Sequence, residues 1–167
     1  MLEIKKADRK DMKTIADFIR SSASWYEPFL AEKDLKEHYV DESWMEKNYK
    51  KRDFYLGVNN EGKEVGTISM QYFEDYTYLG YIYLDSSEVG KGHGKELIDF
   101  AKLKSSKNGQ KSMVLIAHPE AKWATKAYEK YGFKKKATNK DEILKFNNGF
   151  LGPYYEEGFH LYEYTLG

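Results

Sequence analysis

The sequence contains no cysteine, which excludes disulfide bonds, thiolate metal sites and a cysteine nucleophile. Its four histidines show no ligand spacing such as H-E-x-x-H, so we expect no metal site. No stretch approaches the roughly eighteen apolar residues of a membrane-spanning helix, and the first residues carry no apolar signal region. We therefore predict a cytoplasmic protein with no membrane partner.

The chain also lacks an excess of charge of either sign. Lys and Arg number 27, and Asp and Glu number 27, so the molecule as a whole has no field that would attract nucleic acid. We accordingly predict no nucleic-acid partner. The 167 residues, 41% of them hydrophobic and 32% charged, predict one globular domain over residues 1–167.

The most informative stretch that is present is glycine-rich and lies between a strand-like and a helical segment. Its glycines stand at alternate positions, Gly90, Gly92 and Gly94. Glycine allows positive φ and lets a ligand approach the main chain closely. Backbone N–H groups that converge at the start of a helix bind phosphate. The stretch therefore predicts a phosphate-binding loop.

This stretch does not match two common phosphate-binding motifs. A P-loop would need glycine where Val89 stands and a hydroxyl side chain where Glu96 stands. The dinucleotide pattern G-x-G-x-x-G would need a third glycine where Lys95 stands. The loop is therefore expected to bind phosphate in another way.

The loop resembles motif A of the GNAT superfamily, the acetyl-CoA-dependent N-acetyltransferases, which reads Arg/Gln-x-x-Gly-x-Gly/Ala after a strand. Gly92 and Gly94 match its two glycines, and Gly90 matches a further frequent one. Val89 departs from the family's Arg or Gln, and His93 from its usual aliphatic residue. The family holds the diphosphate mainly by backbone N–H groups, so these departures leave the expected contact in place.

A second motif supports the resemblance. The superfamily often carries Asn-x-x-Ala-x-x-x-Tyr-Glu-Lys-x-Gly-Phe, and this chain has Ala124 and then residues 128–133 in register, with Ala121 in place of the asparagine. The glycine loop and this motif are separated by a strand-like run, as in the family. The resemblance covers roughly residues 64–136 by motif and the remainder by the order of elements.

Hydrophobic periodicity predicts the elements in chain order. The strands are expected at 2–7, 54–58, 64–73, 77–84, 113–117, 134–137 and 159–166, and the helices at 8–23, from about Asp34, at 96–106 and at 121–131, with a looping excursion over 144–157. This order, β-α-α-β-β-β-α-β-α-β-β, is that of the GNAT fold. The resemblance thus implies an α/β (α+β) protein with a mixed, mostly antiparallel central sheet flanked by helices.

The resemblance implies acetyl-CoA as the cofactor and assigns residues to its binding. The backbone of Tyr83 and Leu84 would pair with the pantetheine, and an N–H at Leu84 or nearby would stabilise the oxyanion. The predicted cofactor-binding residues are Tyr83, Leu84, Val89, Gly90, Lys91, Gly92, His93, Gly94 and Lys95.

Two residues are predicted to be catalytic. Tyr128 stands where the family places a tyrosine general acid, although a phenol near pKa 10 is a weaker acid than a thiol near 8.5 by about 2 kcal/mol. Hydrogen bonding alone is therefore an alternative role. The family's strand glutamate has no counterpart in residues 76–81. Glu74 and Asp75 are the nearest candidates for the base, with Glu157 and His160 as distant ones, and we predict Glu74, acting through water.

The acceptor pocket is predicted from aromatic side chains in two irregular segments. Its predicted lining residues are Trp25, Tyr26, Phe29, Tyr154, Tyr155 and Glu157, with Glu156 in the same wall. Aromatic faces beside carboxylates favour a cation. We therefore predict a small-molecule amine or polyamine as the substrate, and we leave open whether the protein forms a homodimer.

Other functions stay open at this stage. The reaction could be that of a protein or peptide N-acetyltransferase, which would need an open groove. A non-catalytic acyl-CoA-binding module is a further alternative, because Val89 departs from motif A and the strand carboxylate is missing. The balanced charge and the failed P-loop pattern disfavour a nucleotide- or nucleic-acid-binding domain.

Overall fold

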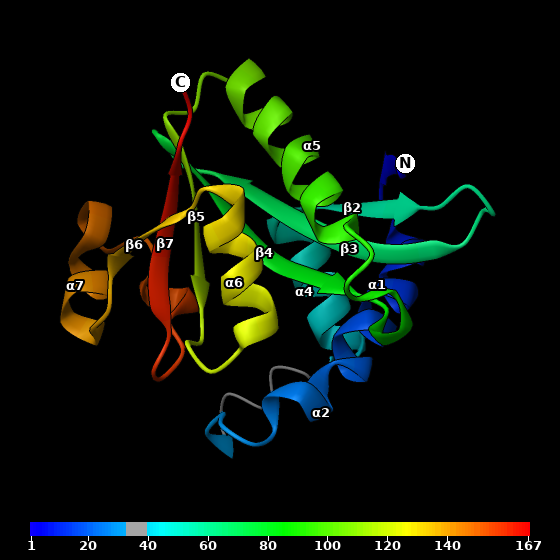
Figure 1. Cartoon of the computed structure of the whole chain (residues 1–167), viewed down its shortest axis with the longest axis horizontal. Helices are drawn as coiled ribbons and strands as arrows, with labels where there is room; N and C mark the ends of the chain where they lie inside the picture. The colour runs from blue at the N-terminus through cyan, green and yellow to red at the C-terminus, as the bar shows by residue number, and fades with distance from the viewer. Residues whose placement is uncertain (33–39) are drawn as a thin grey trace.

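The computed structural model describes residues 1–32 and 40–167, and its seven strands form one sheet in the order β1-β2-β3-β4-β5-β7-β6 (Figure 1). The strands are β1 (Glu3–Lys6), β2 (Asp53–Val58), β3 (Glu64–Tyr72), β4 (Tyr76–Leu84), β5 (Ser112–Ala117), β6 (Lys134–Ala137) and β7 (His160–Thr165). Every neighbouring pair is antiparallel except β4 and β5. The predicted mixed, mostly antiparallel sheet is confirmed.

Helices cover both faces of this sheet. They are α1 (Met12–Ser21), α2 (Ala23–Tyr26), α4 (Glu42–Lys51), α5 (His93–Lys107), α6 (Lys122–Tyr131) and α7 (Lys140–Lys145). Figure 1 shows α5 and α6 in front of the sheet, α1 and α4 behind it, and α7 beside β6. The helix start predicted at Asp34 lies outside the described residues, and α4 is described from Glu42 onward.

The chain forms these layers because its apolar residues recur at the right spacing. Before α1, the N–H of Asp8 donates to the Asp11 carboxylate at 2.8 Å, a contact that caps the turn leading into the helix. The apolar face of α1 packs on β2, whereas α5 buries Leu97, Ile98 and Ala101 against the opposite face of the sheet. The core is therefore divided into two layers by the sheet itself.

The segment between β6 and β7 is more ordered than the looping excursion predicted for it. The side chain of Asn139 accepts the N–H of Glu142 at 2.9 Å and caps α7. Short 3₁₀ turns follow at Phe146–Gly149 and Gly152–Tyr154. Ile143 and Leu151 are buried there, so this segment packs as a small third cluster at the sheet edge.

The parallel pair formed by β4 and β5 separates partway along its length. Tyr76–Tyr78 pair with residues 112–114, and no pairing between β4 and β5 continues beyond them. Opposite β3, the register of β4 contains one extra residue, and Tyr81 adopts a φ of +51° there. This bulge bends β4, so β4 and β5 diverge toward the glycine loop.

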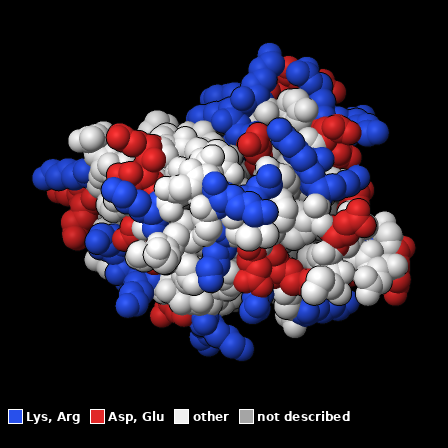
Figure 2. Space-filling view, turned by 90° about the horizontal axis from the view of Figure 1, so that it is seen from above, with Lys and Arg blue, Asp and Glu red and all other residues white. Residues whose placement is uncertain are grey.

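Charges of both signs are interspersed on the face seen from above (Figure 2). The lysines of β6 are exposed on the edge strand of the sheet. No helix in the described ranges is long and apolar enough to cross a membrane. Within those same ranges, no group of three or more His, Asp or Glu side chains is placed to hold a metal ion.

Candidate active site

Two cavities meet where β4 and β5 diverge. The larger, here called the loop cavity, has a volume of about 800 Å³ and lies between the glycine loop, the end of β4 and α6. The smaller, here called the aromatic cavity, has a volume of about 290 Å³ and lies between the end of α4, the middle of β4 and residues 153–156. Residues common to both walls are Tyr26, Ile82, Tyr83, Ala124 and Tyr128. A molecule bound in one cavity can therefore reach a molecule bound in the other.

The glycine loop forms an open backbone cradle at one wall of the loop cavity. Gly90 has a φ of +89°, and Gly92, which precedes the first turn of α5, has a φ of +86°. A Cβ atom at Gly90, Gly92 or Gly94 would have no atom within 4 Å, so the space beside each glycine is open. In the described part of the chain, no backbone N–H of residues 89–95 donates a backbone hydrogen bond. These groups fit a diphosphate, which would accept from several N–H groups at a helix start.

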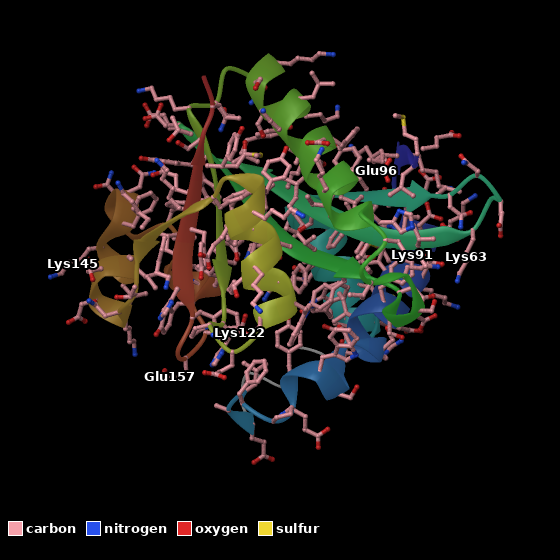
Figure 3. The ribbon with its side chains drawn as sticks, in the orientation of Figure 1. Lys63, Lys91, Glu96, Lys122, Lys145 and Glu157 are labelled. Atoms are coloured by element: carbon pink, nitrogen blue, oxygen red, sulfur yellow. The ribbon has the colours of Figure 1, made fainter. Side chains whose placement is uncertain are left out.

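Glu88 holds this loop in place through contacts of its carboxylate with basic side chains. Its buried carboxylate lies 3.2 Å from Lys63 Nζ and 3.1 Å from Lys91 Nζ, and 3.4 Å from His93 Nε2. Figure 3 shows Lys63 and Lys91 close together at this end of the molecule. Hydrogen bonds from Lys91 and Lys63 lower the pKa of Glu88.

Of the basic residues predicted to contact the cofactor, one lines the loop cavity. Lys95 does so, and its ammonium lies 2.8 Å from Asp99, which lines the same cavity. Lys91 and His93 are turned to Glu88 and line neither cavity. In this geometry their side chains link the loop to Glu88.

Tyr128 lies at the junction of the cavities. It projects from α6, and its ring centroid is 6.0 Å from that of Phe133. Burial raises the pKa of Tyr128 to about 12. Burial also raises the pKa of Tyr26, whose hydroxyl is hydrogen-bonded to Tyr83. The junction is thus lined by neutral phenols that can donate hydrogen bonds.

The aromatic residues predicted after the first helix do gather at the cavities. The rings of Trp25 and Tyr26 lie 5.1 Å and 5.3 Å from Trp123, edge to face. Trp25 lines the loop cavity and Tyr26 lines both. Phe29 lines neither, but its ring lies 4.6 Å from His118, which lines the aromatic cavity.

The C-terminal segment supplies the other predicted wall. Tyr154 and Tyr155 line the aromatic cavity, and the ring of Tyr154 stacks on Tyr78 at 4.8 Å. Glu156 lines this cavity, whereas Glu157 is exposed and lines neither cavity (Figure 3). The substrate-binding role predicted for Glu157 therefore has no geometric support, and its neighbour occupies that place.

Glu74, the predicted base, lies far from this junction. It is exposed in the turn before β4, at the end of that strand opposite to the bulge, and lines neither cavity. Gly80 lies six positions further along the chain, a span of about 20 Å in extended backbone. The structure instead brings Glu156 near the tyrosines, where its negative charge contributes to the raised pKa of Tyr26 and Tyr83.

Sequence reasoning also missed Arg52, at the end of α4. It is 7% exposed and lines the aromatic cavity, with its guanidinium 4.7 Å from the ring of Tyr81. The indole N–H of Trp44 donates to the hydroxyl of Tyr81 at 3.2 Å and fixes that ring. Arg52 follows two exposed lysines at the charged end of a helix. The neighbouring sequence therefore does not distinguish it from a solvent-exposed side chain.

Comparisons with known proteins agree with this geometry. The sequence matches the acetyltransferase (GNAT) domain family over residues 50–135, more than half of the chain. No curated protein matches it in sequence. Among solved structures, a GNAT-family acetyltransferase from Staphylococcus aureus Mu50 is 16% identical with a TM-score of 0.77, and all of each chain is covered.

Two further structures similar to this one were solved with coenzyme A. The PaiA N-acetyltransferase of Thermoplasma acidophilum is 20% identical, with 99% of each chain covered and a TM-score of 0.77. The N-acetylglutamate synthase of Neisseria gonorrhoeae, which also holds N-acetylglutamate, is 15% identical, with all of this chain and 35% of that chain covered and a TM-score of 0.72. The predicted GNAT fold is confirmed, as is the prediction of acetyl-CoA as the cosubstrate at the level of the family. This chain belongs to the GNAT acetyltransferase family.

Proposed function

We propose that this protein transfers the acetyl group of acetyl-CoA to the primary amine of a small molecule. The observation that carries the proposal is the junction of the two cavities at Tyr128, with the open glycine cradle on one side and a separate aromatic cavity on the other. One reactant would occupy each cavity, and Tyr128 lines both.

The volume of the aromatic cavity supports a small acceptor. At about 290 Å³ it lies at the lower end of the range for small-molecule pockets. It is walled by α4, by β4 and by residues 153–156. A protein N-acetyltransferase would need a groove that accepts an extended peptide, and these walls favour a small molecule over a protein substrate.

The residues that would hold the cofactor follow from the loop geometry. The N–H groups of residues 89–95 would bind the diphosphate, and the end of β4 at Tyr83 and Leu84, which lines the loop cavity beyond the residues that pair with β5, would bind the pantetheine. When bound there, acetyl-CoA supplies a thioester-activated acetyl group. Tyr128 then lies where a hydrogen bond to the leaving sulfur is needed.

We assign the role of base to Glu156 instead of Glu74. An alkylamine with a pKa near 10.4 is almost wholly protonated at pH 7, so a proton must leave the nitrogen before it attacks. Glu156 is the carboxylate among the described lining residues of the aromatic cavity. His118 is less suited, because its Nδ1 already accepts the N–H of Glu120 at 3.1 Å.

An assay of thiol release from acetyl-CoA with a panel of primary amines tests the proposal. Glu156→Gln should lower kcat by on the order of 10²-fold at pH 7. The loss should shrink toward pH 10, where the amine deprotonates without help. The same change at Glu74 and at Glu157, the carboxylates predicted from the sequence, should leave kcat within about twofold. Absence of amine-dependent thiol release would refute the proposed function, and a larger loss at Glu74 would restore the first assignment of the base.

A further inference from the structure

Arg52 is buried in the wall of the aromatic cavity. It follows the last turn of α4 and packs its guanidinium against the backbone of β4, where a Cβ atom at Gly80 would lie 2.5 Å from Nη1. The rings of Tyr81 and Tyr154 lie 4.7 Å and 5.4 Å from its guanidinium carbon. The glycine and the two aromatic faces thus hold the guanidinium in one place.

This guanidinium has no anionic partner within residues 1–32 and 40–167. No carboxylate of these residues forms an ion pair with it, and its buried Nε finds no hydrogen-bond acceptor. Arginine stays charged at any physiological pH and carries five N–H donors. A buried charge of this kind is normally paired, because an unpaired one loses its hydration without compensation. The missing acceptor is therefore expected on a ligand.

The charges around Arg52 also favour a ligand with an anionic group. Among the described residues that line the aromatic cavity, three side chains are cationic and one is a carboxylate, namely Lys47, Lys51, Arg52 and Glu156. The ammonium of Lys51 lies 4.5 Å from the ring of Tyr154, beside Arg52. A polyamine would meet more positive than negative charge in this cavity, which argues against the polyamine predicted from the aromatic residues alone.

We propose that the acceptor is a small amine that also bears an oxyanion, such as a carboxylate, and that Arg52 binds this group. The inference rests on the proposed acetyltransferase function and narrows its substrate. The planar guanidinium matches a carboxylate or phosphonate with two parallel hydrogen bonds. With the oxyanion held at the end of α4, the amine of a short molecule is directed to the part of the cavity lined by Tyr128 and Glu156.

Matched acceptors test this proposal. The panel comprises the common amino acids, their carboxamides, the corresponding aminophosphonates and spermidine, each with saturating acetyl-CoA. We expect kcat/KM to be at least about tenfold higher for one or more carboxylates than for the matched carboxamides. A preference for the phosphonate over both would identify the oxyanion as a phosphonate and equally support Arg52 as its binding residue. Spermidine as the best acceptor would overturn the inference while leaving the acetyltransferase function intact.

Substitution of Arg52 provides a second test of the oxyanion site. Arg52→Gln should raise KM for the oxyanion-bearing acceptor by on the order of 10- to 100-fold and change KM for its carboxamide little. Arg52→Lys should recover part of the affinity, since it restores the charge but lacks the planar fork. Lys50→Gln is the matched control, because Lys50 is exposed, lies 3.2 Å from Glu46 and lines neither cavity. Equal losses for charged and neutral acceptors in Arg52→Gln would overturn the inference.

A binding measurement separates this inference from the proposed function. If no amine is acetylated, calorimetric titration of the amino acids and aminophosphonates into the coenzyme A-loaded protein still reports on Arg52. Binding to the wild type that Arg52→Gln abolishes would support the oxyanion site while refuting the acetyltransferase. Absence of oxyanion binding would overturn the inference. Far-ultraviolet circular dichroism of Arg52→Gln and Arg52→Lys confirms that each variant is folded before either result is interpreted.

Discussion

At the scale of single residues, Tyr128 shows how an environment changes a chemical role. Its pKa is raised to about 12 by burial, whereas a thiol titrates near 8.5. Complete proton transfer from the phenol to a thiolate would therefore be uphill by about 5 kcal/mol, more than the sequence suggested. We infer that Tyr128 stabilises the leaving sulfur by donating a hydrogen bond and keeps its proton.

Replacement of Tyr128 by phenylalanine tests this role. Tyr128→Phe keeps the ring that packs near Phe133 but removes the donor, so kcat should fall by on the order of 10²- to 10³-fold with little change in the Kd of acetyl-CoA. Because the pKa is raised, the wild-type rate should show no decline from ionisation of Tyr128 below about pH 11. A pH–rate profile with single-turnover kinetics measures both. An unchanged kcat would remove Tyr128 from the mechanism.

At the scale of elements, the glycine loop is held by ion pairs of Glu88, one of which reaches a residue outside the loop. Lys63, at the hairpin before β3, and Lys91, in the loop, both reach the buried carboxylate of Glu88. The lowered pKa of Glu88 keeps this carboxylate charged at pH values somewhat below the ordinary pKa of glutamate. The anchor therefore contributes stability at neutral pH and loses it as the pH falls through the lowered pKa.

Glu88→Gln should loosen the loop without altering the loop cavity itself. Ordering one residue costs about 1 kcal/mol, so the Kd of acetyl-CoA should rise by about fivefold. In the wild type, calorimetry should give a contribution of this anchor that is constant from pH 8 to 5 and declines only below the ordinary range of glutamate. Glu61→Gln, in the exposed turn between β2 and β3, is the control. A Kd equal to that of the control would show that the anchor does not support binding.

Features that depend on residues adjacent in the sequence, such as helix caps, could be predicted. Features that depend on the register between two strands could not. The cap at Asp8, the apolar face of α1 and the glycine at the start of α5 all depend on neighbouring residues. The helix α7 was missed although Asn139 and the acidic residues after it give a capping signal. The bulge at Tyr81 has no such signal, because it is defined by the register of β4 on β3.

At the scale of the whole molecule, the proposed cofactor joins β4, the loop and α6, so its binding should stabilise the native state. Acetyl-CoA at about 100 times its Kd adds about 2.7 kcal/mol and should raise Tm by about 5–10 °C. Gly92→Glu should abolish this shift, because it places bulk and negative charge in the open cradle.

Gly109→Glu is the matched control for that thermal experiment. Gly109 also has a positive φ, +78°, with open space around it, and it lies beyond the opposite end of α5. Both substitutions strain the backbone and lower the starting Tm, but only Gly92→Glu should lose the shift on adding acetyl-CoA. A full shift in Gly92→Glu would contradict the placement of the diphosphate at this loop.

The sequence by itself determined the order of the elements, the glycine cradle and the position of Tyr128, because each of these depends on residues close together in the chain. Only the tertiary structure decided which carboxylate lines the aromatic cavity and that a buried arginine lines the same cavity. Glu156 and Arg52 are about a hundred residues apart, and they meet because α4, β4 and the segment before β7 close around one space. The charge of a cavity is the sum over side chains from several elements that only folding brings together. The aromatic residues alone therefore indicated a purely cationic acceptor, whereas the assembled cavity favours an amine that also bears an oxyanion.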